Sequence, residues 1–176
     1  MDYDYKLFRD PIHGFIYVSP EELRIIDSRP FQRLRRIRQL ALTNLVYHGA
    51  EHTRFAHSLG VMHLVSRVFD IITSKNNIFS EPQKAWYKQI LRLIGLIHDL
   101  GHAPFSHGSE DVLPAGLKHE DFTEKIVCET EIAEYINNIG VKFCQKFGSQ
   151  FNITKAHIRK KLGNIWSGMI IGCGNI

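Results

Sequence analysis

The feature that most constrains the fold is a helical repeat of apolar residues in the middle of the chain. From residue 53 onward, such residues recur every three or four positions: Phe55, Leu59, Met62, Val65, Phe69 and Ile72. This spacing predicts one buried stripe on a long helix that ends at residues 76–77. A second helix is predicted over 82–98. Its last turns are almost entirely apolar, so we expect it to be central.

Local signals place the other elements around this pair. Ser19, Pro20 and Glu22 form a capping-box pattern, which predicts a helix running to about residue 27. An arginine-rich helix is predicted over 30–40, and further helices over 119–130, 131–138 and 154–162. Residues 10–14 favour a turn, residues 15–18 a short strand, and Gly101 a C-terminal helix cap. The expected fold class is all-α: one helical domain over 1–176 with a short N-terminal extended segment.

Composition narrows the classes of function. Hydrophobic residues make up 44% and charged residues 23% of 176 residues, the balance of a globular protein. We see no uninterrupted apolar run long enough for a bilayer and no secretory signal, and the three cysteines form no CxxC pair. We therefore expect a cytoplasmic protein with free thiols. The net charge of +4 and pI of 9.0 favour an anionic partner.

Histidines are concentrated where the two central helices begin and end. Eight of the ten lie between His48 and His119. His57 points off the apolar stripe, and His98-Asp99 closes the apolar helix. A carboxylate and an imidazole are expensive to bury without a partner, and a shared divalent cation offsets that cost. Mixed imidazole and carboxylate ligands suit Mn, Fe, Ni, Zn or Mg. Taken singly, each of these residues is more often structural than a ligand.

The wider strings carry a family resemblance. Residues 52–61 read HTRFAHSLGV and residues 98–107 read HDLGHAPFSH, with DPIHG at 10–14 and FQRLRRIRQL at 31–40 upstream. From about residue 6 to 126 the chain resembles the HD superfamily of metal-dependent phosphohydrolases. Within that superfamily it resembles the deoxynucleoside triphosphate triphosphohydrolases, the branch of the sterile-alpha-motif/HD enzymes and their bacterial relatives. The resemblance implies hydrolysis of a deoxynucleoside triphosphate to a deoxynucleoside and inorganic triphosphate.

The same resemblance assigns residues to roles. The implied metal ligands are His57, His98 and Asp99, with a fourth aspartate further along the chain. The implied catalytic and phosphate-site residues are His102, His107, His119, Glu120 and Arg54, with Arg54 on the triphosphate and Gln39 and Leu40 against the sugar. Imidazole titrates near neutral pH, so either His107 or His119 is suited to protonate the departing 5′ oxygen. Some family members have a regulatory nucleotide site between subunits, which matches Lys6, Asp27, Gln32 and Arg35 and implies a homo-oligomer.

The chain also departs from the family pattern. No aspartate follows Asp121, and residues 163–176 form an apolar, glycine-rich tail. We interpret the chain as a shortened member of the family, with weak activity by itself. Two alternatives stay open: a catalytically silent nucleotide-binding or interaction module, and an HD phosphohydrolase acting on another nucleotide. The arginines of 30–40 also fit a solvated helix face, whereas nucleic-acid binding is disfavoured because aromatic residues are not interleaved with them.

Overall fold

The computed structural model describes residues 5–75, 78–105, 108, 113, 116–160 and 162. The elements in chain order are β1 (Lys6–Asp10), β2 (Gly14–Val18), α1 (Pro20–Asp27), α2 (Arg29–Gln32), the 3-10 helices η1 (Arg33–Arg36) and η2 (Thr43–Leu45), α3 (Arg54–Lys75), α4 (Glu81–Ile97), α5 (His119–Glu129), α6 (Glu131–Phe147) and the 3-10 helix η4 (Ser149–Phe151). Residues 155–160 are also helical. The predicted all-α class with a short extended N-terminal segment is confirmed.

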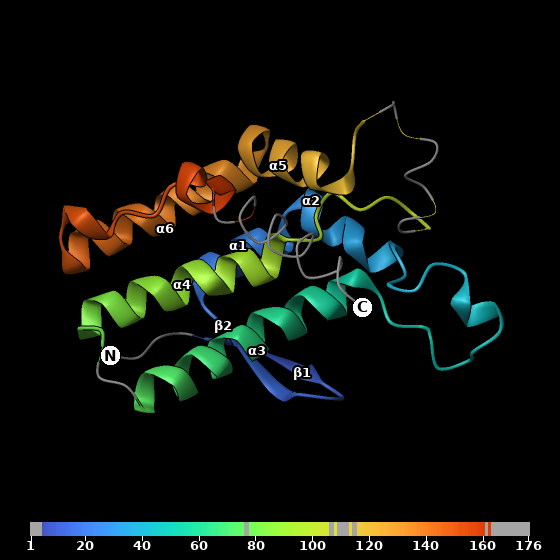
Figure 1. The fold of residues 1–176 in the computed structure, drawn as a ribbon, viewed down its shortest axis with the longest axis horizontal. Helices are drawn as coiled ribbons and strands as arrows, with labels where there is room; N and C mark the ends of the chain where they lie inside the picture. Colours follow the sequence, from blue (N-terminus) through green and yellow to red (C-terminus); the bar gives the residue numbers. More distant parts are fainter. Residues whose placement is uncertain are drawn as a thin grey trace, which may run out of the picture.

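The long helices α3 and α4 lie side by side and run in opposite directions (Figure 1). Leu59 and Met62 of α3 and Leu93 of α4 are buried in the single core cluster of the described residues. The helices approach closely at Gly95, where an added Cβ would lie 3.1 Å from the Cα of Met62. Because α3 and α4 run in opposite directions, the first turn of α3 lies beside the last turn of α4.

The N-terminal hairpin and α1 pack against this pair. In the antiparallel hairpin Phe8 pairs with Ile16, and the buried side chains of Ile16 and Val18 join the core. The predicted capping box of α1 is present, with the Ser19 hydroxyl accepting from the backbone of Glu22 and the Glu22 carboxylate accepting from that of Ser19. Glu22 also pairs with Arg92 at 2.7 Å, which ties α1 to α4.

Helices α5 and α6 form the other side of the bundle. They pack on each other, α6 also contacts α1, and η4 lies against α6 and α4 (Figure 1). The buried residues Val127, Ile132, Ile136 and Ile139 join these helices to the same core. The turn that follows α4 reaches this layer, because Gly101 lies against the first turn of α5.

Two predicted helices were wrong in extent. The helix predicted over 30–40 stops at Arg36, because the backbone of Ile37 and Gln39 bonds instead to Arg54 and His52, at 2.9 and 3.0 Å. The helix predicted over 131–138 continues to Phe147. Strand β1 was not predicted at all, although it lies in the segment expected to be extended.

Two predictions about packing were also wrong. The apolar stripe of α3 does not extend to Ile72, whose side chain is 51% exposed, and the buried face continues instead through Ser66 and Thr73. Gly101 is not a left-handed helix cap, since the C-cap of α4 is His98 and the described glycines with positive φ are Gly14, Gly116 and Gly148. Gly101 serves close packing, as described below.

By length and composition, α3 is the one helix among the described residues that could cross a membrane. A core helix of a globular protein can have the same length and composition. Here α3 packs along α4 and places Phe55, Leu59 and Met62 in the core.

Candidate metal centre

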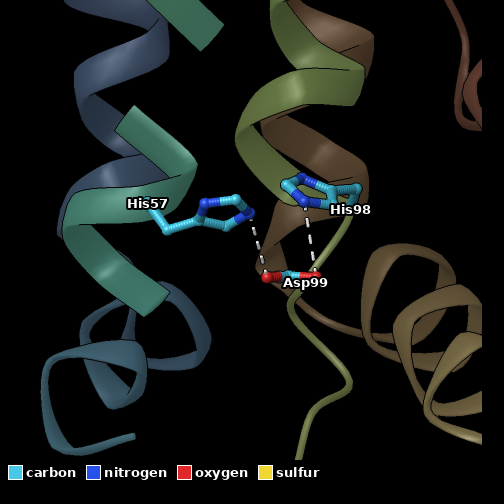
Figure 2. A group of neighbouring side chains, drawn as sticks. All are labelled: His57, His98 and Asp99. Carbon is cyan, nitrogen blue, oxygen red and sulfur yellow. Dashed lines mark ion pairs between the residues drawn. The ribbon is translucent and has the colours of Figure 1, made fainter. Parts of the chain in front are cut away.

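Three predicted ligands converge from two helices. His57 lies in the first turns of α3, His98 directly follows α4, and Asp99 comes next, with its carboxylate between the two rings (Figure 2). His57 Nε2 lies 3.6 Å from Asp99 Oδ2, and His98 Nε2 lies 3.4 Å from Asp99 Oδ1. One ligand atom of each residue lies within 4.8 Å of the others. The antiparallel packing of α3 on α4 produces this meeting point.

The ring of His98 is oriented by its own helix. Its Nδ1 lies 2.9 Å from the carbonyl oxygen of Gly95. A carbonyl can only accept a hydrogen bond, so Nδ1 carries a proton, and in the neutral ring Nε2 presents its lone pair toward Asp99. Such a hydrogen bond to the far nitrogen is how proteins fix the tautomer of a metal-binding histidine.

The carboxylate of Asp99 is held by a buried arginine. Arg54 Nη1 lies 2.6 Å from Asp99 Oδ2, and the two side chains are only 4% and 8% exposed. Burial raises the pKa of Asp99, but the nearby charges of His98, Arg54 and the other histidines lower it, and the net pKa lies below the ordinary 3.8. Asp99 is therefore ionised at neutral pH, the form that binds a metal.

The surroundings of His57 favour its neutral form. Burial lowers its pKa below the ordinary 6.5, and the positive charges of His98 and Arg54 lower it further against the attraction of Asp99. A neutral imidazole at neutral pH offers a free lone pair.

The donor set fits a divalent cation. Two imidazole nitrogens and one carboxylate oxygen suit first-row transition metals and zinc. Nitrogen ligands at roughly 2.1 Å from one metal lie at most about 4.2 Å apart. The ligand atoms all lie within 4.8 Å of one another, so they need to move together by at most a few tenths of an ångström on binding.

A second group of histidines adjoins the cluster. His102 Nε2 lies 3.5 Å from Asp99 Oδ1, and the His102 ring stacks on that of His119 with centroids 3.8 Å apart. His119 Nδ1 in turn lies 3.3 Å from a carboxylate oxygen of Glu120. The structure thus connects Asp99, His102, His119 and Glu120 in one chain of contacts. His107 lies outside the described residues.

The residues predicted to contact the nucleotide are less closely gathered. Gln39 is half-buried, and its backbone pairs with His52 just before α3, while the Leu40 side chain is 45% exposed. Of the four residues predicted to form a regulatory nucleotide site, two are in contact, since Gln32 Oε1 accepts a hydrogen bond from Arg35 Nε at 2.8 Å. Lys6 in β1 and Asp27 at the end of α1 are exposed on other elements.

Sequence reasoning missed the residues that support the turn after α4. Arg33 of η1 donates to the carbonyl oxygen of Leu100, the residue next to Asp99. Thr123 of α5 contacts the backbone at both His98 and Gly101. Neither role can be read from the neighbouring sequence, because both residues contact the turn across long sequence separations.

Comparison of the sequence with known protein families agrees with this geometry. The model of the HD domain matches residues 54–166, more than half of the chain and including the three clustered residues. The chain therefore belongs to the HD-domain family, and the resemblance to HD phosphohydrolases is confirmed.

Several longer proteins are similar to this chain. The uncharacterized protein YwfO of Bacillus subtilis is 37% identical over 94% of this chain, which spans only 37% of YwfO. The deoxynucleoside triphosphate triphosphohydrolase SAMHD1 of Gallus gallus is 44% identical over 77% of this chain and 24% of its own length. A phosphohydrolase structure from Bacteroides thetaiotaomicron matches with a TM-score of 0.60 and 32% identity, over 84% of this chain and 33% of that one.

Proposed function

We propose that this chain carries the metal-binding part of a phosphohydrolase that converts a deoxynucleoside triphosphate to a deoxynucleoside and inorganic triphosphate. The observation that supports it most is the placement of Asp99 between His57 and His98, with the stacked His102 and His119 beside it. The identity with SAMHD1 proteins favours the triphosphohydrolase reaction over others of the family.

In the proposed reaction, water attacks the α-phosphorus and the bond from phosphorus to the 5′ oxygen breaks. The water oxygen stays with the triphosphate, and the 5′ oxygen takes a proton to complete the deoxynucleoside. When bound, a divalent ion supplies Lewis acidity to the water and to the phosphoryl group. His57, His98 and Asp99 would hold that ion.

The other residues are proposed to stabilise negative charge and to donate protons. Arg54 keeps Asp99 ionised and fixed. His102 and His119 lie beside Asp99 and are proposed to donate hydrogen bonds to phosphate oxygens, and either His119 or His107 is proposed to supply the proton for the 5′ oxygen. Gln39 and Leu40 are proposed to lie against the sugar, where a close fit excludes a 2′ hydroxyl.

Product analysis tests this proposal directly. The purified protein, in excess over nucleotide so that slow turnover is detectable, is incubated with Mn²⁺ and either a deoxy- or a ribonucleoside triphosphate. Anion chromatography should show inorganic triphosphate, formed faster from the deoxynucleotide. His57→Ala should abolish the product, whereas His63→Ala, on the same helix but outside the cluster, should not.

The alternatives give different results. Pyrophosphate or orthophosphate as the main anion would indicate an HD phosphohydrolase of another specificity. Bound Mn²⁺ without any turnover would indicate a catalytically silent module.

We also propose a regulatory role for Lys6, Asp27, Gln32 and Arg35, supported by the pairing of Gln32 with Arg35 on the surface of α2 and η1. A guanine nucleotide should then promote assembly of the chain into a homo-oligomer. A sedimentation profile unchanged by guanosine triphosphate would contradict this role.

A further inference from the structure

Thr123 is a buried polar residue that links the metal-ligand turn to α5. Its side chain is 0% exposed. The hydroxyl oxygen lies 2.8 Å from the backbone nitrogen of Gly101 and 3.2 Å from the carbonyl oxygen of His98. It also lies 3.1 Å from the carbonyl oxygen of His119, one turn earlier in its own helix. One atom therefore contacts both ends of the turn that presents Asp99.

The valence of a hydroxyl limits how these contacts are used. It has one proton to donate and two lone pairs that accept. The backbone N–H of Gly101 donates to it, and the single proton goes to either His98 or His119. A bond to His119 is the ordinary back-bond of a helical threonine. The contacts with Gly101 and His98 span 22 and 25 residues, so they fix tertiary structure.

The turn lies directly on the first turn of α5 at this point. A Cβ added to Gly101 would lie 2.0 Å from the carbonyl oxygen of His119 and 2.4 Å from the nitrogen of Thr123. The same first turn of α5 carries His119, whose ring stacks on His102. Any displacement of the turn relative to α5 therefore changes how the metal ligands lie relative to this second histidine group.

We propose that Thr123 is a positioning residue, whose hydroxyl holds the turn at residues 98–101 in the geometry that binds the metal and aligns it with His119. The effect on turnover rests on the proposed function, whereas the effect on metal binding does not. The hydrogen bonds of Thr123 go to backbone atoms, so it acts on the metal ligands through the backbone of His98 and Gly101.

Three variants separate this role from ordinary core packing. Thr123→Val keeps the shape and removes the hydroxyl, and Thr123→Ser restores it. Thr73→Val is the matched control, since Thr73 is a buried threonine of α3 whose hydroxyl donates at 2.9 Å to Phe69 of its own helix. Thr123→Ala replaces the valine variant if that variant does not fold.

The first readout is amide hydrogen exchange in the metal-free protein, and the second is the Mn²⁺ dissociation constant. Thr123→Val should exchange the Gly101 amide about fivefold faster, as expected for one lost hydrogen bond. It should raise the Mn²⁺ dissociation constant about 10–100-fold, the usual effect of removing a residue that orients a metal ligand. Thr123→Ser should stay near the parent protein, and Thr73→Val should lose stability in urea but keep its Mn²⁺ affinity.

The proposal is overturned if Thr123→Val keeps both the Gly101 exchange rate and the Mn²⁺ affinity. It is also overturned if Thr73→Val loses as much Mn²⁺ affinity as Thr123→Val, because global destabilisation then explains the effect. Lower Mn²⁺ affinity in Thr123→Val alone supports the positioning role even if the parent protein hydrolyses no nucleotide, an outcome that would count against the proposed function instead.

Discussion

Replacing Gly101 with alanine tests whether the metal-ligand turn needs its close contact with α5. The added Cβ would lie 2.0 Å from the carbonyl oxygen of His119. Carbon and oxygen atoms in contact are normally no closer than about 3.3 Å, so the turn or α5 must move by about 1.3 Å. That movement also breaks the hydrogen bonds of Thr123 with Gly101 and His98.

The magnitude follows from these two effects. Overpacking a core position costs about 1–3 kcal/mol. Each lost hydrogen bond adds about 0.5–1.5 kcal/mol. Gly101→Ala should therefore lower the free energy of unfolding by about 4 kcal/mol and, for a chain of this size, the melting temperature by about 12 °C.

Urea and thermal unfolding of the metal-free protein measure this change. Gly49→Ala is the matched control, because a Cβ at Gly49 meets nothing within 4 Å. That variant should be unchanged or slightly more stable, since alanine restricts the unfolded chain. If Gly101→Ala unfolds within about 0.5 kcal/mol of the parent, the turn is not packed as described.

Three further predictions concern the rest of the molecule. Arg92→Met should lower the free energy of unfolding in urea by about 3–5 kcal/mol, because it leaves the buried Glu22 carboxylate without its charged partner. Lys88→Met breaks an exposed ion pair and should cost less than about 1 kcal/mol. Equal losses in the two variants would contradict this. Burial and nearby basic residues lower the pKa of His63 below 6.5, so the free energy of unfolding should decrease as the pH falls from 6.5 toward the pKa of the folded protein. His63→Asn should flatten that decline in unfolding curves recorded from pH 7 to 5. Because the described residues supply three clustered ligands, the protein should retain little metal after exhaustive dialysis and should turn over nucleotide slowly. Near-stoichiometric metal together with robust turnover would contradict this.

Local signals in the sequence were read correctly where local chemistry decides the structure. The capping box of Ser19 and Glu22 begins α1 as predicted, and α3 begins within one residue of its predicted start. The cluster of His57, His98 and Asp99 was also anticipated, first as a shared cation site from their places on two helices and then as metal ligands from the family resemblance. The geometry that joins these three residues depends on the crossing of α3 and α4.

The errors share a physical cause, since each involves a tertiary contact that has no local pattern. Residues 37–39 leave the helical path because their backbone pairs with residues 52–54. The helix predicted to end at residue 138 continues through Gly140, where a Cβ would lie 2.0 Å from the carbonyl oxygen of Ile153, so that glycine serves close packing. Gly101 is likewise required by contact with α5 rather than by a cap. Thr123 looks like any helical threonine until the turn at Gly101 is placed against it.

Equilibrium dialysis against Mn²⁺ tests most directly whether His57, His98 and Asp99 form a metal centre. At saturating Mn²⁺ the parent protein and the His63→Ala control should each bind one ion per chain at this site. Asp99→Asn keeps the shape of the side chain but removes the only carboxylate of the three clustered residues, so saturable binding should be lost. Binding by Asp99→Asn with the affinity and stoichiometry of the parent would contradict the account.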